Sequence, residues 1–471
     1  MNDPNGLVFY EGEYHLFYQF NPFGDKWGHM SWGHAVSPDL VHWRHLPVAL
    51  PEEDGIMIFS GSAVVDWKNT TGFGKNGRPP LIAIYTGRRN VDDHQFQCIA
   101  YSNDKGRTWT KYAGNPVIDI GSKNFRDPKV FWHAPSRRWV MVVSLAADRK
   151  VRFYGSPNLK EWTQLSDFGP AGAVKGVWEC PDLFPLKLDG APARTNWVLI
   201  VNVGSGSVAG GSGGQYFVGN FDGTHFTPDR PAASDSNEAL WVDYGRDYYA
   251  AVSWSDVPKG RRLWIGWMSN WEYAQDVPTS PWRSAMSLPR ELHLKKFDDG
   301  VRLVQMPVKE VQSLRERHYH IQKQSFAAAN ASLHQRGISG EVFELDAELE
   351  PASASECGVK LRKGAHEETV ISYDTLQHRL FVDRTHSGRV NFNKAFPGVH
   401  SAPVPLENGR IKLNIFVDRS SIEVFANDGR VTVTELVFPD SESIGVELYA
   451  NDPEKAQVRT LDFWRLRSVW R

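Results

Sequence analysis

Three short acidic motifs in the first 180 residues carry the side chains best suited to chemistry. They read MNDPNG at 1–6, NFRDP at 124–128 and VWECP at 177–181. Each motif contains one carboxylate at an expected turn or strand edge: Asp3, Asp127 and Glu179. Cleavage of a glycosidic bond with retention of configuration needs one carboxylate as nucleophile and a second as proton donor. The set therefore has the side chains for this reaction.

Each carboxylate also has an ordinary structural explanation. Asp3 lies in NDPNG, which forms turns whatever its function. Arg126 and Asp127 could form a structural ion pair, and Glu179 could be a simple strand-edge acid. Folding alone does not readily explain all three motifs in one chain rich in aromatic residues, so the catalytic interpretation is preferred.

Strand patterns dominate the part of the chain that carries these motifs. Short apolar or alternating runs recur there, bounded by Gly, Pro, Asn or Asp, and amphipathic helical patterns are almost absent. One pattern of Ser, Asx, a turn and Trp recurs three times, ending at Trp43, Trp109 and Trp162. Repeats of roughly 60 residues with about four strands each are typical of propeller blades. We therefore expect a five-bladed β-propeller over residues 1–308.

The remainder of the chain has a different pattern. PVKEVQSLRER at 307–317 is the most helical stretch and predicts a helical linker over 309–318. From residue 319 onward the density of Trp falls, and roughly a dozen short strands with polar turns predict a two-sheet β-sandwich over 319–471. The expected fold class is all-β, with two domains.

Composition excludes several functions. The 53 basic and 55 acidic residues nearly cancel, so we expect neither nucleic acid nor an anionic membrane as a partner. The three cysteines, Cys98, Cys180 and Cys357, are too far apart for a disulfide framework or a zinc motif. Asp92, Asp93 and His94 are interpreted as a polar loop rather than as metal ligands. We expect no metal and no cofactor.

The motifs resemble the successive signatures of glycoside hydrolase family 32, which contains invertases, inulinases and levanases. The resemblance extends to further stretches: WGHMSWGHAVSPDLVHW at 27–43, FSGS at 59–62, WIGWMSNWEYAQDVPTSPWRSAMSLPREL at 264–292 and SSIEVFANDG at 420–429. It therefore covers nearly the whole chain. The family fold is a five-bladed propeller followed by a β-sandwich, in agreement with the repeats.

The resemblance implies a role for each carboxylate. Asp3 matches the family nucleophile, Glu179 the acid/base and Asp127 the transition-state stabiliser. A nucleophile must be ionised, and an amide donor such as Asn2 would favour that form of Asp3. Glu179 must begin protonated, and an apolar wall such as Trp178 or Cys180 would favour that form. Asp127 should bind fructosyl hydroxyls more tightly in the transition state than in the ground state.

The resemblance also implies a binding site for a terminal fructose. The residues that match this site are Asn2, Gln19, Trp27, Phe59, Ser60 and Arg126. Trp271 is either a substrate platform or a packing residue. The implied reaction releases terminal non-reducing β-D-fructofuranosyl residues from fructans or sucrose through a fructosyl-enzyme intermediate. The stretch NWEYAQDVPTSPWR is closer to exo-acting levanases and inulinases than to plant invertases, while the choice among levan, inulin and sucrose and the oligomeric state stay open.

Three other functions compete with this interpretation. The first is an inverting arabinan- or xylan-cleaving propeller of family 43, which also uses three carboxylates. A gap of about 5–5.5 Å between the carboxyl groups of Asp3 and Glu179 would indicate retention, and a wider gap inversion. The second is a sialidase, because SNDKGRTW at 102–109 resembles an Asp-box. The third is a fructan-binding protein without activity, against which the intact Asp3 and Glu179 argue.

The position of Asp3 near the start of the chain affects the expected location. Family members carry a short aromatic strand before the MNDPNG turn, whereas this sequence opens at Met1. We expect either a longer natural sequence or another segment in place of that strand. Polymeric fructan cannot enter a cell intact, so an enzyme acting on it from a longer precursor would be extracellular. A chain that truly begins at Met1 would be cytoplasmic.

Overall fold

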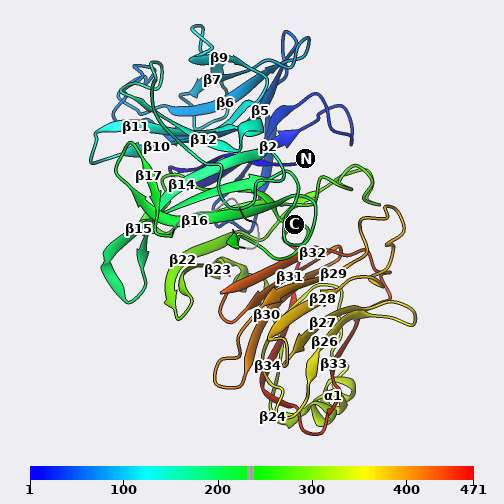
Figure 1. Cartoon of the computed structure of the whole chain (residues 1–471). Helices are drawn as coiled ribbons and strands as arrows, with labels where there is room; N and C mark the ends of the chain where they lie inside the picture. The colour runs from blue at the N-terminus through cyan, green and yellow to red at the C-terminus, as the bar shows by residue number, and fades with distance from the viewer. Residues whose placement is uncertain (231–234, 236–237, 471) are drawn as a thin grey trace. The chain divides into compact units, whose positions relative to one another are not determined.

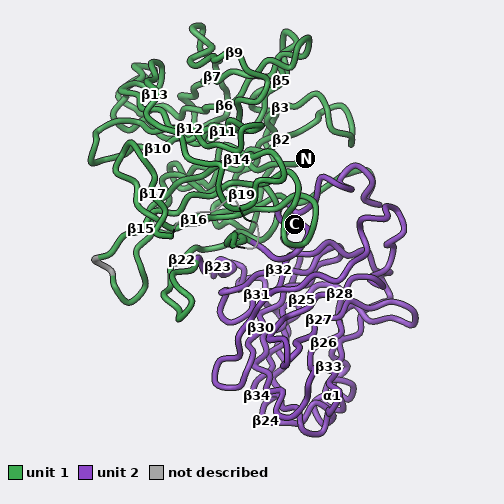
Figure 2. Tube along the Cα trace, viewed as in Figure 1, with its two compact units in different colours: residues 1–242, 249–267, 281–302 green, residues 243–248, 268–280, 303–471 purple. Residues whose placement is uncertain are grey.

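The computed structural model describes the whole chain except residues 231–234, 236–237 and 471 (Figure 1). The described residues form two compact units (Figure 2). The first unit contains residues 1–242, 249–267 and 281–302. The second unit contains residues 243–248, 268–280 and 303–471.

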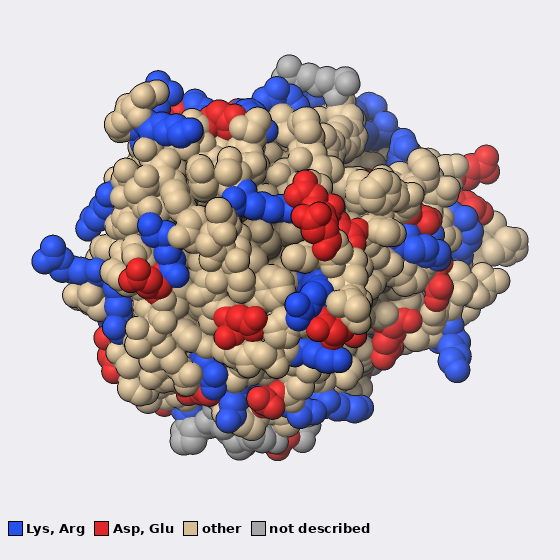
Figure 3. Space-filling model, turned by 90° about the horizontal axis from the view of Figure 1, so that it is seen from above, with Lys and Arg blue, Asp and Glu red and all other residues tan. Residues whose placement is uncertain are grey.

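Strands make up nearly all of the regular structure, which confirms the predicted all-β class. Among the described residues the one α-helix is α1 (Phe326–Gln335). None of the described helices has the length and apolar character needed to cross a membrane. On the face shown in Figure 3, acidic and basic side chains are interspersed, in keeping with their similar numbers.

The first unit begins with three antiparallel sheets in which neighbouring strands follow the order of the chain. The first sheet contains β1 (Pro4–Tyr10), β2 (Glu13–Phe20), β3 (Ser31–Ser37) and β4 (Arg44–Leu50). The second contains β5 (Ile56–Val65), β6 (Leu81–Arg89), β7 (Gln95–Ser102) and β8 (Thr110–Lys111), with β9 (Ile118–Ser122) also on β7. The third contains β10 (Phe125–His133), β11 (Arg138–Leu145), β12 (Lys150–Ser156) and β13 (Thr163–Phe168).

A fourth, larger sheet completes the strands of this region. One half contains β14 (Trp178–Leu188), β15 (Ala191–Val203), β16 (Gly213–Phe221), β17 (Phe226–Pro228) and β18 (Leu240–Trp241). The other half contains β19 (Tyr249–Ser253), β20 (Leu263–Met268), β21 (Ala285–Met286), β22 (Arg290–Phe297) and β23 (Gly300–Pro307). The two halves are joined by one parallel pairing, Leu188 with Leu294.

The three smaller sheets and the two halves of the fourth sheet form five groups of strands. The first strands of these five groups contact one another in a ring. β5 contacts β1 and β10, β14 contacts β10 and β19, and β19 contacts β1. Two backbone hydrogen bonds of 2.9 Å, from Phe9 N to Ser255 O and from Ser255 N to Leu7 O, join the start of the chain to the segment after β19. Motifs far apart in the sequence are thereby brought together.

The repeated Ser–Asx–turn–Trp pattern corresponds to one repeated turn. The indole N–H donates to the carbonyl oxygen three residues earlier in each copy, at 3.0 Å for Trp43, 3.1 Å for Trp109 and 3.0 Å for Trp162. Each Trp directly precedes the fourth strand of its sheet, β4, β8 or β13. The sequence repeat was therefore a reliable guide to the sheet boundaries.

The second unit contains two further sheets. A six-stranded sheet has the order β24 (Arg315–Ser325), β34 (Gln457–Leu466), β25 (Phe343–Glu350), β30 (Ile411–Asp418), β31 (Ser421–Ala426) and β32 (Val431–Leu436). A five-stranded sheet has the order β29 (Val399–Pro403), β28 (Arg379–Asp383), β27 (Thr369–Asp374), β26 (Glu356–Lys363) and β33 (Gly445–Ala450). Both contribute to one apolar core, for example with Leu345 and Val424 from the first sheet and Val359 and Ile371 from the second.

The helical predictions for the second half of the chain were partly wrong. The expected helical linker at 309–318 is helical only over Lys309–Leu314, as a 3-10 helix, and β24 begins at Arg315. α1 was not expected. Its apolar residues Phe326, Ala329 and Leu333 recur at helical spacing and are buried in the core, but the alanines and small polar residues between them obscured the amphipathic pattern.

Candidate active site

The three predicted carboxylates lie at the starts of first strands in the first unit. Asp3 directly precedes β1, Asp127 lies in β10 and Glu179 lies in β14. In each case the antiparallel register shifts within the next few residues, between Asn5 and Val8, Arg126 and Lys129, and Glu179 and Asp182. A β-bulge re-aims side chains and is frequent next to active sites.

The backbone at these irregularities adopts conformations that are uncommon for residues other than glycine. The φ angle is 67° at Asp127 and 44° at Cys180. A positive φ is incompatible with extended strand geometry, and the register of β14 shifts at this point. The Cys180 N–H, which follows Glu179, donates to Oδ2 of Asp127 at 2.9 Å. The structure thus brings Asp127 and Glu179 together.

Asp3 is held by three donors. Ser60 Oγ donates to Oδ2 at 2.8 Å, Asn2 Nδ2 donates to Oδ1 at 3.1 Å, and Cys180 Sγ lies 3.6 Å from Oδ2. Loss of hydration, followed by the charge of Glu179, raises the pKa of Asp3, while the three donors act in the opposite direction. The expected hydrogen bond from Asn2 is present and lowers the pKa of Asp3, but the effect of burial on that pKa is larger.

Asp127 is buried, with 6% of its surface exposed. Loss of hydration raises its pKa to about 7; the guanidinium of Arg126 opposes this shift, whereas the charges of Glu179 and Asp3 add to it. The backbone N–H of Asp127 donates to Thr86 Oγ1 at 2.9 Å, which fixes the strand at this point. The charges of the three carboxylates therefore interact.

Glu179 is bound through both of its oxygens. Arg126 donates to Oε1 from Nε at 3.0 Å and from Nη2 at 2.9 Å. The hydroxyl of Tyr249 donates to Oε2. The Arg126 ion pair is thus with Glu179, not with Asp127 as the structural alternative had it. A carboxylate held at both oxygens has a fixed orientation.

Trp178 does not form the expected apolar wall beside Glu179. Neighbouring residues in a strand point to opposite faces, and the Trp178 indole is buried against Phe168 and Phe217. Its Nε1 donates to Ala173 O at 2.9 Å. The expectation for Trp178 was therefore wrong, because strand alternation directs it into the core.

The remaining predicted binding residues occupy different environments. Asn2 and Ser60 contact Asp3 as described above, and Arg126 contacts Glu179. Gln19 is buried, donates from Nε2 to Ile58 O at 2.9 Å, and accepts Asn2 N at its carbonyl oxygen at 3.1 Å. Trp27 is 44% exposed and lies edge-on to Phe59, with ring centroids 6.0 Å apart. Trp271 belongs to the second unit and stays a prediction.

Sequence reasoning missed Tyr249 as a contact of Glu179. Tyr249 lies in the first strand of the last group, β19, and its side chain is fully buried. Burial and then the charge of Glu179 raise its pKa well above the usual range, so its hydroxyl stays a donor. Nothing in the sequence links positions 179 and 249; only the ring of first strands brings them together.

The segment Asp92–His94 behaves as the predicted polar loop. Asp92 pairs with Arg89, Asp93 pairs with Arg88, and His94 pairs with Asp119. The three side chains therefore have three separate partners.

Comparison with known proteins gives consistent family matches. The model described as the glycosyl hydrolases family 32 N-terminal domain matches residues 1–307, and the model of the family 32 C-terminal region matches residues 310–465. A levanase from Bacillus subtilis (strain 168) is 56% identical over all of this chain and 69% of its own length.

Two solved structures are similar over almost the whole chain. The exo-inulinase from Aspergillus awamori has a TM-score of 0.91 at 41% identity, covering 100% of this chain and 96% of its own. The β-fructofuranosidase from Schwanniomyces occidentalis, solved with fructosyl-erythritol, has a TM-score of 0.87 at 32% identity, covering 99% and 95% of the two chains. The chain therefore belongs to glycoside hydrolase family 32 and is a glycoside hydrolase of the fructosidase type.

Proposed function

We propose that this enzyme removes terminal non-reducing β-D-fructofuranosyl residues from fructans and from sucrose, with retention of configuration through a fructosyl-enzyme intermediate. The names of the levanase and exo-inulinase relatives support the substrate class. One observation carries the mechanism: Cys180 contacts Asp127 through its backbone N–H and Asp3 through its thiol, and it directly follows Glu179. Asp3, Asp127 and Glu179 therefore all lie next to Cys180.

In the first step Asp3 attacks the anomeric carbon of the bound fructosyl unit. The glycosidic C–O bond breaks, an ester bond forms between Asp3 and the sugar, and Glu179 transfers its proton to the leaving oxygen. The donors Ser60 and Asn2 favour the ionised, attacking form of Asp3 and oppose the effect of burial on its pKa. Arg126 and Tyr249 fix the direction in which Glu179 delivers its proton.

In the second step Glu179 removes a proton from water, and the resulting oxygen attacks the same carbon. The ester bond breaks and releases fructose and ionised Asp3, while Glu179 regains its proton. Two inversions at one carbon give net retention. Asp127 binds hydroxyls of the sugar ring, and its hydrogen bonds strengthen as the ring flattens in both transition states.

The proposed fructose site uses six residues of the first unit, Asn2, Gln19, Trp27, Phe59, Ser60 and Arg126. The contacts of Asn2, Ser60 and Arg126 with the catalytic carboxylates support their part in it. The edge-on pair Trp27 and Phe59 provides exposed aromatic surface of the kind on which sugar rings stack.

The proposed architecture is a five-bladed β-propeller over 1–308 and a β-sandwich over 319–471, connected by the segment 309–318. The ring of contacts among β1, β5, β10, β14 and β19 supports the propeller, because each is the first strand of one group. The shared apolar core of the two sheets in the second unit supports the sandwich.

Methanolysis tests the stereochemical course. Sucrose hydrolysed in the presence of methanol should yield methyl β-D-fructofuranoside as the first transfer product, identified by NMR before it is consumed. Methyl α-D-fructofuranoside would show inversion and would contradict the double-displacement mechanism. The Asp3→Asn variant serves as the control and should form neither product.

A further inference from the structure

One face of the six-stranded sheet in the second unit carries two histidines and a carboxylate in contact. His318 and His320 lie on β24, and Asp462 lies on the adjacent strand β34 (Figure 1). Oδ1 of Asp462 is 2.7 Å from His318 Nε2 and 2.8 Å from His320 Nδ1. The proposed hydrolase mechanism uses none of these residues.

Strand alternation places the three side chains on the face opposite the core. Ile321 of β24 and Phe463 of β34 point into the apolar core, so the residues at the alternate positions point outward. The antiparallel register sets His320 opposite Asp462 and His318 opposite Trp464. The cluster is therefore a direct consequence of this pairing and not of a mobile loop.

We propose that His318, His320 and Asp462 form a binding site for a divalent late transition-metal cation, with Zn²⁺ as the expected occupant. Their ligand atoms all lie within 4.8 Å of one another. In a tetrahedral site with metal–ligand distances of about 2.0–2.1 Å, the ligand atoms are about 3.3 Å apart. Formation of the site therefore requires the three side chains to adjust from the hydrogen-bonded distances of 2.7 and 2.8 Å to this spacing.

The donor set determines the kind of metal. Two imidazole nitrogens and one carboxylate oxygen suit Zn²⁺, Cu²⁺ or Ni²⁺, whereas Ca²⁺ and Mg²⁺ prefer oxygen ligands alone. The side chains of His318, His320 and Asp462 are 48%, 42% and 25% exposed. Water can therefore complete the coordination shell, and an affinity in the micromolar range is expected.

Neighbouring groups hold the first histidine in place. The imidazole of His318 stacks on Trp464, with ring centroids 4.8 Å apart and an angle of 7° between the planes. The Arg315 guanidinium lies 3.9 Å from the Trp464 ring centroid and is paired with Glu344 at 2.6 and 2.7 Å. Groups that orient a metal ligand raise its affinity for the ion.

The local charge also favours a cation. Asp346 lies opposite Asp462 in the register of β25 and β34, and Glu344 lies two residues before it on the same face. Two cations are also near: Arg315 is paired with Glu344, and Arg336 donates to the carbonyl oxygen of His320 at 3.1 Å.

A bound ion would connect two neighbouring strands of the sheet that are far apart in the sequence. In the order of the chain, β24 is the first strand of this sheet and β34 is the last. An ion that binds the folded state alone increases stability in proportion to the logarithm of its concentration above the dissociation constant. The consequence of this site is thus a metal-dependent increase in the stability of the second unit, separate from the hydrolysis of sugars.

Calorimetric titration of the full chain with ZnCl₂, after treatment with EDTA, tests the proposal. One Zn²⁺ per chain should bind with micromolar affinity and raise the unfolding temperature. The His318→Gln/His320→Gln double variant should lose both effects, and Asp462→Asn should weaken binding by about tenfold or more. His366→Gln, at an exposed histidine of the same unit, is the matched control and should behave as the parent protein.

The outcome that overturns the proposal is also specific. Unchanged stoichiometry and affinity in the double variant would place the zinc elsewhere, and binding no tighter than millimolar would mean that the cluster is an ordinary surface ion pair. The single variant His318→Gln keeps the test valid if the double variant does not fold. It retains the hydrogen bond of His320 to Asp462 and should still lower the zinc affinity.

Discussion

The backbone N–H of Cys180 donates to Oδ2 of Asp127 across a distance of 2.9 Å, from a peptide that has left the β-sheet ladder. Both residues have positive φ angles, 44° and 67°. The bulges in β10 and β14 therefore do more than interrupt pairing. They place Asp127 next to the peptide that carries Glu179, and the Cys180 thiol next to Asp3.

Replacing Asp127 should make the protein more stable as well as inactive. Its pKa is about 7 in the fold against an ordinary value of 3.8, so the folded state binds this proton more tightly than the unfolded state. Stability due to this group therefore falls as pH rises from about 4 to about 7. Asp127→Asn should raise the unfolding temperature by an amount that grows across this window and then levels off.

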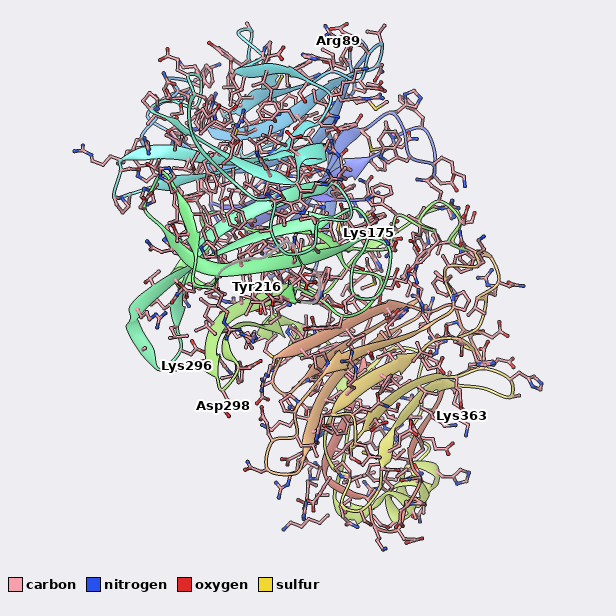
Figure 4. The ribbon with its side chains drawn as sticks, viewed as in Figure 1. Arg89, Lys175, Tyr216, Lys296, Asp298 and Lys363 are labelled. Atoms are coloured by element: carbon pink, nitrogen blue, oxygen red, sulfur yellow. The ribbon has the colours of Figure 1, made fainter. Side chains whose placement is uncertain are left out.

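Thermal unfolding of Asp127→Asn between pH 4 and pH 8 checks this prediction. Asp298→Asn provides the control, because it removes the same charge from an exposed side chain in the turn between β22 and β23 (Figure 4). If the gain in unfolding temperature of Asp127→Asn became smaller between pH 4 and pH 7, the prediction would be contradicted.

Tyr249→Phe should lower kcat/KM for sucrose without changing the fold. The variant removes one hydroxyl, which donates to Oε2 of Glu179. A hydrogen bond to a charged group contributes about 1.5–3 kcal/mol, which corresponds to a loss of roughly 10- to 100-fold. Tyr101→Phe, at a half-buried ring stacked on Phe73, is the control. Equal rates in the two variants would remove Tyr249 from the site.

The proposed attack on terminal residues predicts a specific product pattern. A site that holds one terminal fructose should release monosaccharide from the start of the reaction. Chromatography of an early inulin or levan digest should show fructose as the main product. A ladder of oligosaccharides at low conversion would indicate an endo-acting groove instead.

The second unit depends on a buried cluster of charges. Arg384 Nη1 lies 2.5 Å from Asp247 Oδ2 and 2.9 Å from Glu435 Oε2, and all three side chains are inaccessible to solvent. Arg384→Met leaves two carboxylates without their cation, which should cost about 3–5 kcal/mol of unfolding free energy. Denaturant titration against Arg419→Met, at a side chain that is 77% exposed, measures the difference. Equal losses of unfolding free energy in Arg384→Met and Arg419→Met would show that the buried ion pairs of Arg384 contribute no more than an exposed arginine.

Periodicity allowed much of the fold to be predicted from the sequence. The three Trp turns mark successive sheets because each repeats the same local hydrogen bond, which short sequence patterns encode. The resemblance to family 32 correctly predicted that Asp3, Asp127 and Glu179 lie close together in the structure. The backbone geometry that brings them together was not predictable. Asp127 and Cys180 have positive φ angles, and neither position is a glycine, the residue that would have indicated such a conformation.

Long-range partners were the other limit. Arg126 was paired with its neighbour Asp127 in the structural alternative, yet it binds Glu179, 53 residues away along the chain. The contact of Tyr249 with Glu179 spans 70 residues. Such contacts depend on which first strands meet, and local sequence carries no signal for them. The alternation of β14 likewise turned Trp178 away from Glu179.

The identity of the two reacting carboxylates is the central claim, and azide rescue tests it most directly. Glu179→Ala should hydrolyse sucrose at least about 10²–10⁴-fold more slowly, because general acid–base assistance is lost. On an activated fructoside, which needs no proton for departure, added azide should restore its turnover and give β-D-fructofuranosyl azide. Asp3→Ala should form no such product. Rescue of Asp3→Ala in place of Glu179→Ala, or an inverted azide from Glu179→Ala, would contradict the assigned roles.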